Sequence, residues 1–202
     1  PAREVFAGAW HARRHLLAVG LDDPVPDYIT LDGALAELRR QRAAVLVPHP
    51  GFATMSLGAA DVRRQASAID AVETYNAKLL PHQNRRGRRI AAETGLPAFG
   101  SSYAHLRGTV GEVWTRFPDV EPTGDAVLEA LRSGAPRAVE HRGGAAHRAR
   151  RLAELGHVGY ENSLQKARLL AKGPKATNPY HPAYDGGFDD AAAYPEWVRS
   201  PE

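Results

Sequence analysis

Cysteine is absent from the chain, and this absence limits the chemistry open to it. Neither a disulfide framework nor a zinc-thiolate site can form, so any metal must be held by imidazole and carboxylate groups. Nine histidines supply the nitrogen ligands. Imidazole nitrogen combined with carboxylate oxygen favours zinc, manganese or iron over calcium or magnesium.

Long apolar runs are missing as well. No stretch approaches the roughly 20 residues of a membrane-spanning helix, and no signal-peptide pattern opens the sequence, so we expect a cytoplasmic protein without a membrane partner. The formal charge is only +3 over 202 residues. Such a small surplus suits an anionic small-molecule substrate, and nucleic acid is a partner that the sequence permits without favouring.

The chain alternates between strand-like and helix-like segments. Strands are expected at residues 4–7, 15–21, 44–47, 71–76, 97–101, 113–117 and 137–140. Helices are expected at residues 30–42, 56–66, 83–94 and 123–132. Repeated strand-helix units of this kind favour an α/β protein with a parallel sheet or barrel.

Three regions follow from this pattern. Residues 1–140 form the barrel portion, 141–172 form a C-terminal helical segment that we expect to be interrupted at 156–159, and 173–202 form a loop-rich tail. His141 and His147 match no site and are expected on the surface. The first residue is Pro1, without a methionine or a polar lead-in, which indicates a processed or partial chain.

The stretch Val45-Leu-Val-Pro-His49-Pro-Gly51 is the centre of the sequence pattern. Its apolar half is too short for a helix and predicts a buried parallel strand. His49 follows at the carboxyl end, where α/β folds place their chemistry. Because Pro50 disfavours helical geometry in the residue before it, we expect His49 to be extended.

Four potential metal ligands fall at or just beyond the ends of predicted strands. They are Glu4, His15, His49 and His105. If these strands are parallel neighbours, the side chains meet at one rim and form a site for a first-row metal. His11 is an alternative to His15, although only His15 opens a clear strand.

At these residues the sequence resembles the PHP (polymerase and histidinol phosphatase) superfamily of metal-dependent phosphoesterases. The similarity rests on five short motifs in the family's order: Glu4-Val, Arg14-His15-Leu-Leu-Ala-Val-Gly20, Val47-Pro-His49-Pro-Gly51, Val72-Glu-Thr-Tyr-Asn76 and Gly100-Ser-Ser-Tyr103-Ala-His105. The resemblance implies a distorted (β/α)7 barrel with up to three divalent metal ions, Zn, Mn or Fe, at its carboxyl rim. It also implies hydrolysis of a phosphate ester by metal-bound hydroxide, with a phosphorylated metabolite or nucleotide as substrate.

Two departures from the family pattern bear on activity. The family's opening Asp-x-His-x-His and Thr-Asp-His strands are not found ahead of Glu4, so the barrel is expected to lack its first strands. Tyr103 stands where the family has a metal-binding aspartate, and a phenol with a pKa near 10 is a poor substitute for a carboxylate at neutral pH. The chain therefore also fits a catalytically impaired homologue or fragment that acts as a binding or regulatory module.

Two further residues are candidates for substrate binding. Asn76 ends a predicted strand at the same rim, where it either bonds a ligand or caps a turn. Arg85 belongs to the run Asn84-Arg-Arg-Gly-Arg-Arg89, the densest charge in the sequence. The run is expected to be a solvated helix exterior, and the alternative is that one of its arginines reaches the rim and binds a substrate phosphate. Glu73, inside the preceding strand, is expected to be structural.

Overall fold

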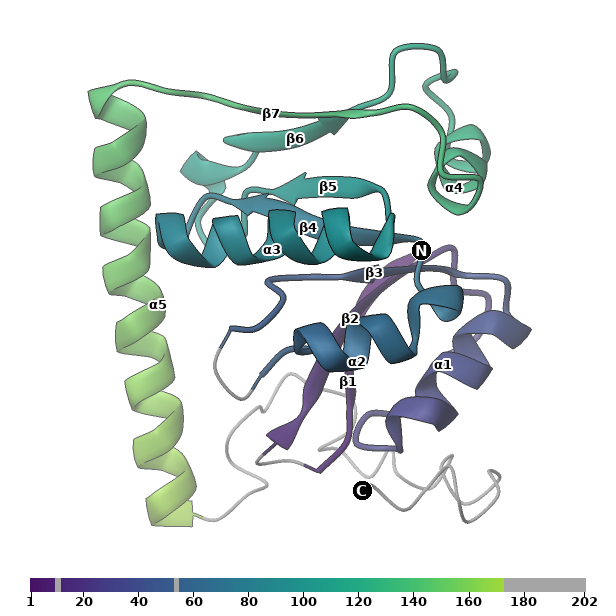
Figure 1. Ribbon diagram of the computed structural model, residues 1–202. Helices are drawn as coiled ribbons and strands as arrows, with labels where there is room; N and C mark the ends of the chain where they lie inside the picture. The colour runs from purple at the N-terminus through teal and green to yellow at the C-terminus, as the bar shows by residue number, and fades with distance from the viewer. Residues whose placement is uncertain (10–11, 53–54, 173–202) are drawn as a thin grey trace.

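The fold is an open sheet with helices packed on it. The computed structural model describes residues 1–9, 12–52 and 55–172 (Figure 1). Its main sheet has five strands in the order β1-β2-β3-β4-β5. They are β1 (Ala2–Ala7), β2 (Arg14–Val19), β3 (Ala44–Val47), β4 (Ala71–Asn76) and β5 (Ala98–Ser101). A second, two-stranded sheet consists of β6 (Val113–Arg116) and β7 (Ala138–His141).

The strand directions overturn the expected barrel. β2 runs antiparallel to both β1 and β3, and only the pairs β3–β4 and β4–β5 are parallel. β6 and β7 form an antiparallel ribbon beside β5. A (β/α)7 barrel needs parallel strands that close on themselves, whereas the described strands form a mixed sheet that does not close. The prediction of a PHP-type barrel lacking its first strands is therefore wrong for this chain.

Helices cover both faces of the main sheet, and α1 and α3 have clear start or stop signals. The helices are α1 (Leu31–Arg40), α2 (Ala59–Arg64), α3 (Pro81–Thr94), α4 (Gly124–Arg132) and α5 (Ala145–Lys172). The Thr30 side chain caps α1 by accepting a hydrogen bond from the Gly33 N–H at 3.0 Å. α3 opens with Pro81 and stops at Gly95, whose φ of 71° is left-handed.

The core has one layer on each side of the sheet. Val45 and Val47 of β3 point towards α1, α2 and α3, while Ala44 and Leu46 point the other way, where Leu131 of α4 packs. β3 is thus buried on both faces, as its uniformly apolar sequence predicted. This burial fixes the strand, and the turn that follows it, in the middle of the molecule.

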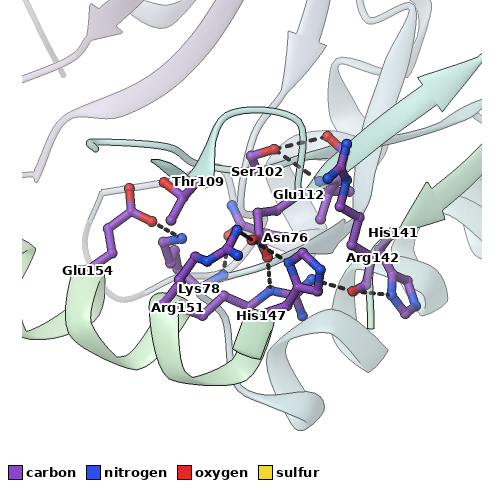
Figure 2. A network of polar contacts seen from close by, with 12 residues as sticks. Asn76, Lys78, Ser102, Thr109, Glu112, His141, Arg142, His147, Arg151 and Glu154 are labelled. Atoms are coloured by element: carbon purple, nitrogen blue, oxygen red, sulfur yellow. Dashed lines mark hydrogen bonds and ion pairs between the residues drawn. The ribbon is translucent and has the colours of Figure 1, made fainter. Parts of the chain in front are cut away.

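α5 is one continuous helix through Gly156 and Gly159, so the expected interruption is wrong. Figure 2 shows the polar contacts of two carboxylates, Glu112 and, on α5 itself, Glu154, that hold the helix to the rest of the chain. Both carboxylates are buried. Glu112 accepts hydrogen bonds from His147 at 2.8 Å and from Arg151 at 2.9 Å. His147 is therefore part of an internal contact and is not the surface residue we expected.

The second carboxylate is Glu154 on α5. It forms an ion pair with Lys78, whose side chain is 3% exposed, and accepts backbone N–H bonds from His105 and Leu106. We call the contacts of Glu112 and Glu154 the α5 anchor.

No helix in the described ranges is long and apolar enough to cross a membrane.

Candidate metal centre

The β1–β2 hairpin brings the first two predicted ligands together. Its register pairs Glu4 with Leu17 and Phe6 with His15, so Glu4 and His15 are diagonal neighbours on one face. His49 lies two residues beyond Val47, the last residue of β3, which is the strand on the other side of β2. The three side chains therefore converge as predicted, but through antiparallel pairing and not through a rim of parallel strands.

One carboxylate oxygen lies at the centre of this group. Glu4 Oε1 is 2.9 Å from His15 Nδ1 and 3.5 Å from His49 Nε2. One ligand atom from each of the three residues lies within 4.8 Å of the others. We refer to Glu4, His15 and His49 as the metal cluster. Two imidazoles and one carboxylate are a donor set that catalytic zinc sites use, with a fourth position left for water or substrate.

His49 shows that the metal cluster fits a cation. Its side chain is 2% exposed, and neither ring nitrogen makes a hydrogen bond within the described residues. A buried polar atom without a partner costs about 1–3 kcal/mol, so native structures rarely leave one without a reason. A divalent ion bound to Nε2, the nitrogen 3.5 Å from Glu4 Oε1, would give one of the two ring nitrogens a partner.

The protonation states also suit metal binding. Burial alone would raise the pKa of Glu4, but its hydrogen bond with His15 and the charges of the nearby His15 and His49 imidazoles outweigh burial and lower this pKa to about 2. Burial lowers the pKa of His15, and the Glu4 carboxylate only partly opposes this shift. An ionised carboxylate and a neutral imidazole are the forms that donate electron pairs to a metal.

The backbone of His49 departs from our expectation. Its φ is 32°, in the left-handed region, although it lies between two prolines and was predicted to be extended. Its N–H donates a 2.5 Å hydrogen bond to Glu73, which is fully buried and also accepts from Asn76 and Ser101. This tertiary contact overrides the local preference set by Pro50.

Tyr103 borders the metal cluster, and its ring centroid lies 5.6 Å from that of His49. Burial, with the nearby Glu4 and Glu73 carboxylates, raises the pKa of Tyr103 to about 12, so it remains a neutral phenol at pH 7. His105 is exposed and packs edge-on against Tyr103, with ring centroids 4.8 Å apart. The Tyr103 ring therefore lies between His105 and His49 of the metal cluster.

The other predicted site residues lie elsewhere. Asn76 is buried, and its amide is occupied by the Glu73 carboxylate and by the N–H of Lys78. Arg85 is exposed on α3, in the depressions that flank this helix, and not at the metal cluster. His11, the alternative to His15, lies outside the described residues.

Two residues near the metal cluster were not predicted as part of a site. Arg13 donates to His15 Nε2 at 3.3 Å and places a positive charge beside the cluster. The only sequence signal for Arg13 is its position two residues before His15, which is too weak to single it out. Glu73 was expected to be structural, and it does hold the His49 backbone. The sequence signal that could have linked Glu73 to the site is its place in the Val-Glu-x-x-Asn motif.

Comparison with known proteins identifies one family. Residues 81–136, from the first turn of α3 to just before β7, match the family described as PHP-associated. The chain contains a PHP-related domain. The PHP-associated match includes Tyr103 and His105 but begins after the metal cluster, so the relation of Glu4, His15 and His49 to PHP ligands rests on the short motifs.

A solved structure resembles the chain over most of its length. The crystal structure of PsfC from Pseudomonas syringae PB-5123 aligns with a TM-score of 0.56 and 19% sequence identity, over 78% of this chain and 64% of PsfC. At this identity the similarity shows a shared fold, and the chain spans less than two thirds of PsfC. No protein with a curated description matches the chain.

Proposed function

We propose that the metal cluster binds one divalent transition-metal ion and that the chain hydrolyses a phosphate ester there. The observation that carries the proposal is His49, a buried imidazole without a hydrogen bond, beside an ionised carboxylate and a second imidazole. Three protein ligands are enough for one ion and leave a coordination position open. When bound, such an ion polarises a phosphoryl oxygen and lowers the pKa of water.

Residues of the chain itself suit an anionic substrate. The Arg13 guanidinium beside His15 offers a fork of N–H donors that matches two phosphoryl oxygens. The neutral phenol of Tyr103 is a hydrogen-bond donor at the same edge. Glu73 accepts a hydrogen bond from the His49 backbone N–H and so helps to hold the buried imidazole in place.

A second candidate function is a PHP homologue that retains metal but does not turn over a substrate. Tyr103 favours it, because this neutral phenol occupies the position at which the family motif has an aspartate. A neutral phenol adds no negative charge for a second ion, so the described residues supply one carboxylate where the resemblance implies several. The chain would then act as a binding or regulatory module.

Metal content and turnover distinguish the two candidates. Elemental analysis would give the metal content, and aryl phosphate hydrolysis with added Mn²⁺ or Zn²⁺ would give the turnover. Both would be measured on four untagged proteins: the parent, His49→Ala, His82→Ala and Tyr103→Asp. His82 is an exposed histidine of α3 outside the metal cluster and is the matched control. We expect about one ion per chain in the parent and in His82→Ala, and loss of the ion in His49→Ala.

Turnover then decides between the candidates. Metal-dependent hydrolysis by the parent that disappears in His49→Ala supports the phosphoesterase, and Tyr103→Asp is expected to raise the rate. Metal binding without hydrolysis in either the parent or Tyr103→Asp supports the module. A parent protein that binds no metal refutes both.

A further inference from the structure

A groove between α2 and α3 gathers most of the arginines of the basic run. The two helices pack side by side on the same face of the sheet (Figure 1). The cavity between them measures about 510 Å³, large enough for a small molecule with several charged groups. It is lined by Ala59, Arg63, His82, Arg85, Arg86, Arg89, Ile90 and Glu93.

The charges in this α2–α3 groove are strongly unbalanced. Four of its lining residues are arginines and one is a glutamate. The glutamate, Glu93, is already paired with Arg63 at 2.8 Å. Arg85 and Arg89 make no hydrogen bond or ion pair within the described residues. They lie four positions apart on α3 and therefore on the same face of the helix. Like charges at that spacing repel and slightly destabilise the helix, so the arrangement is one that a bound anion would stabilise.

The walls of the groove are fixed by contacts with the sheet. Gly87 allows the α3 backbone to approach β4 so closely that a Cβ at this position would lie 2.3 Å from the Glu73 carbonyl oxygen. Ile90 is 1% exposed beneath the arginines. Arg86 Nη1 lies 3.4 Å from the carbonyl oxygen of Gly51, two residues after His49. The guanidiniums therefore project from a rigid helix beside the turn that carries His49.

We propose that the α2–α3 groove is a binding site for phosphoryl groups of a small, multiply charged molecule. Guanidinium groups match phosphate oxygens in pairs, and several converging arginines select a ligand with more than one negative charge. The concave shape and size fit a compact polyphosphate better than a nucleic-acid backbone, which needs an extended basic surface. The site contains no residue of the metal cluster, so it binds its ligand without a metal ion.

Adjacent arginines on α3 provide a matched test. Arg89 lines the α2–α3 groove, whereas Arg88 lines a different depression on the other side of α3, with Arg148 and Arg151. We would measure the affinity of the full chain for inorganic tripolyphosphate by titration calorimetry, with a chelator present to keep the metal cluster out of the measurement. Arg89→Ala is expected to weaken binding about tenfold, while Arg88→Ala, with the same change of charge, leaves it unchanged.

The outcomes distinguish specific binding in the α2–α3 groove from non-specific binding to a basic surface. Equal losses in the two variants, or tighter binding of a single-stranded oligonucleotide than of tripolyphosphate, would overturn the proposal. An affinity that neither variant changes would overturn it as well. Circular dichroism of each variant confirms that the fold is retained. Because the metal cluster is inactive in this assay, failure here leaves the proposed hydrolase untouched, and failure of the hydrolase leaves the groove untouched.

Discussion

Replacing Glu154 with glutamine tests whether the α5 anchor is as buried as the structure shows. The substitution preserves the size of the side chain and removes its charge. Lys78, with 3% of its side chain exposed, would then be a buried ammonium group without a counter-charge. Breaking one member of a buried ion pair costs about 3–5 kcal/mol, and we expect a loss in this range from the free energy of unfolding. A single domain typically has about 5–15 kcal/mol in total, so the effect is large.

Urea unfolding followed by far-ultraviolet circular dichroism gives that free energy. The matched control is Glu140→Gln, which removes the same charge from an exposed pair with Arg116 and should change the midpoint little. The double variant Lys78→Met/Glu154→Gln removes both charges, and we expect it to regain most of the lost stability. If Glu154→Gln unfolds at the parent's midpoint, or if the double variant is no more stable than the single one, the buried pair does not exist in solution.

Two further predictions concern stability. Hydrogen bonds to Glu154 and its pairing with Lys78 outweigh burial and lower its pKa to about 2, below its unfolded value near 4.5. This carboxylate therefore contributes stability above pH 4.5 that is lost as the pH falls towards 2, by about 3 kcal/mol in total; unfolding free energies at several pH values should show a shallower acid dependence in Glu154→Gln than in the parent. Gly87→Ala should destabilise the fold by more than 1 kcal/mol, because its Cβ would meet the Glu73 carbonyl, whereas Gly156→Ala, in an open part of α5, should stabilise it by about 0.5–1 kcal/mol. Thermal unfolding that shifts in the same direction for both glycine variants would contradict the close packing of α3 on β4.

The sequence predicted the elements well and their assembly poorly. The apolar run at β3 and the Thr30 cap of α1 are local signals, because short-range sterics and hydrogen bonding determine them. The direction of β2 is not a local property. The same alternation of buried and exposed residues fits a parallel and an antiparallel strand, so the family resemblance was taken to mean a barrel where the chain forms an open mixed sheet.

Part of the site was also predictable, because some of its residues carry local sequence signals. Glu4, His15 and His49 stand at strand ends or in motifs, and the structure brings them together. His105 is exposed and follows Tyr103, whose φ of 48° is left-handed. The tertiary contact to the His105 backbone comes from Glu154, 49 residues further along the chain, and no local pattern indicates it. His147, Arg151 and Glu154 recur at i, i+4 and i+7, but charges at that spacing usually mark a solvated face.

The left-handed backbone at His49 has a consequence for which metals the chain would accept. A residue with a Cβ adopts such a φ at a cost of about 1–3 kcal/mol, which the surrounding packing has to cover. The packing therefore holds this imidazole in one position, and an ion bound there as proposed would have to accept the bond lengths that this position allows. Replacing Pro48 or Pro50 should then loosen the turn and widen the range of metals that elemental analysis finds bound.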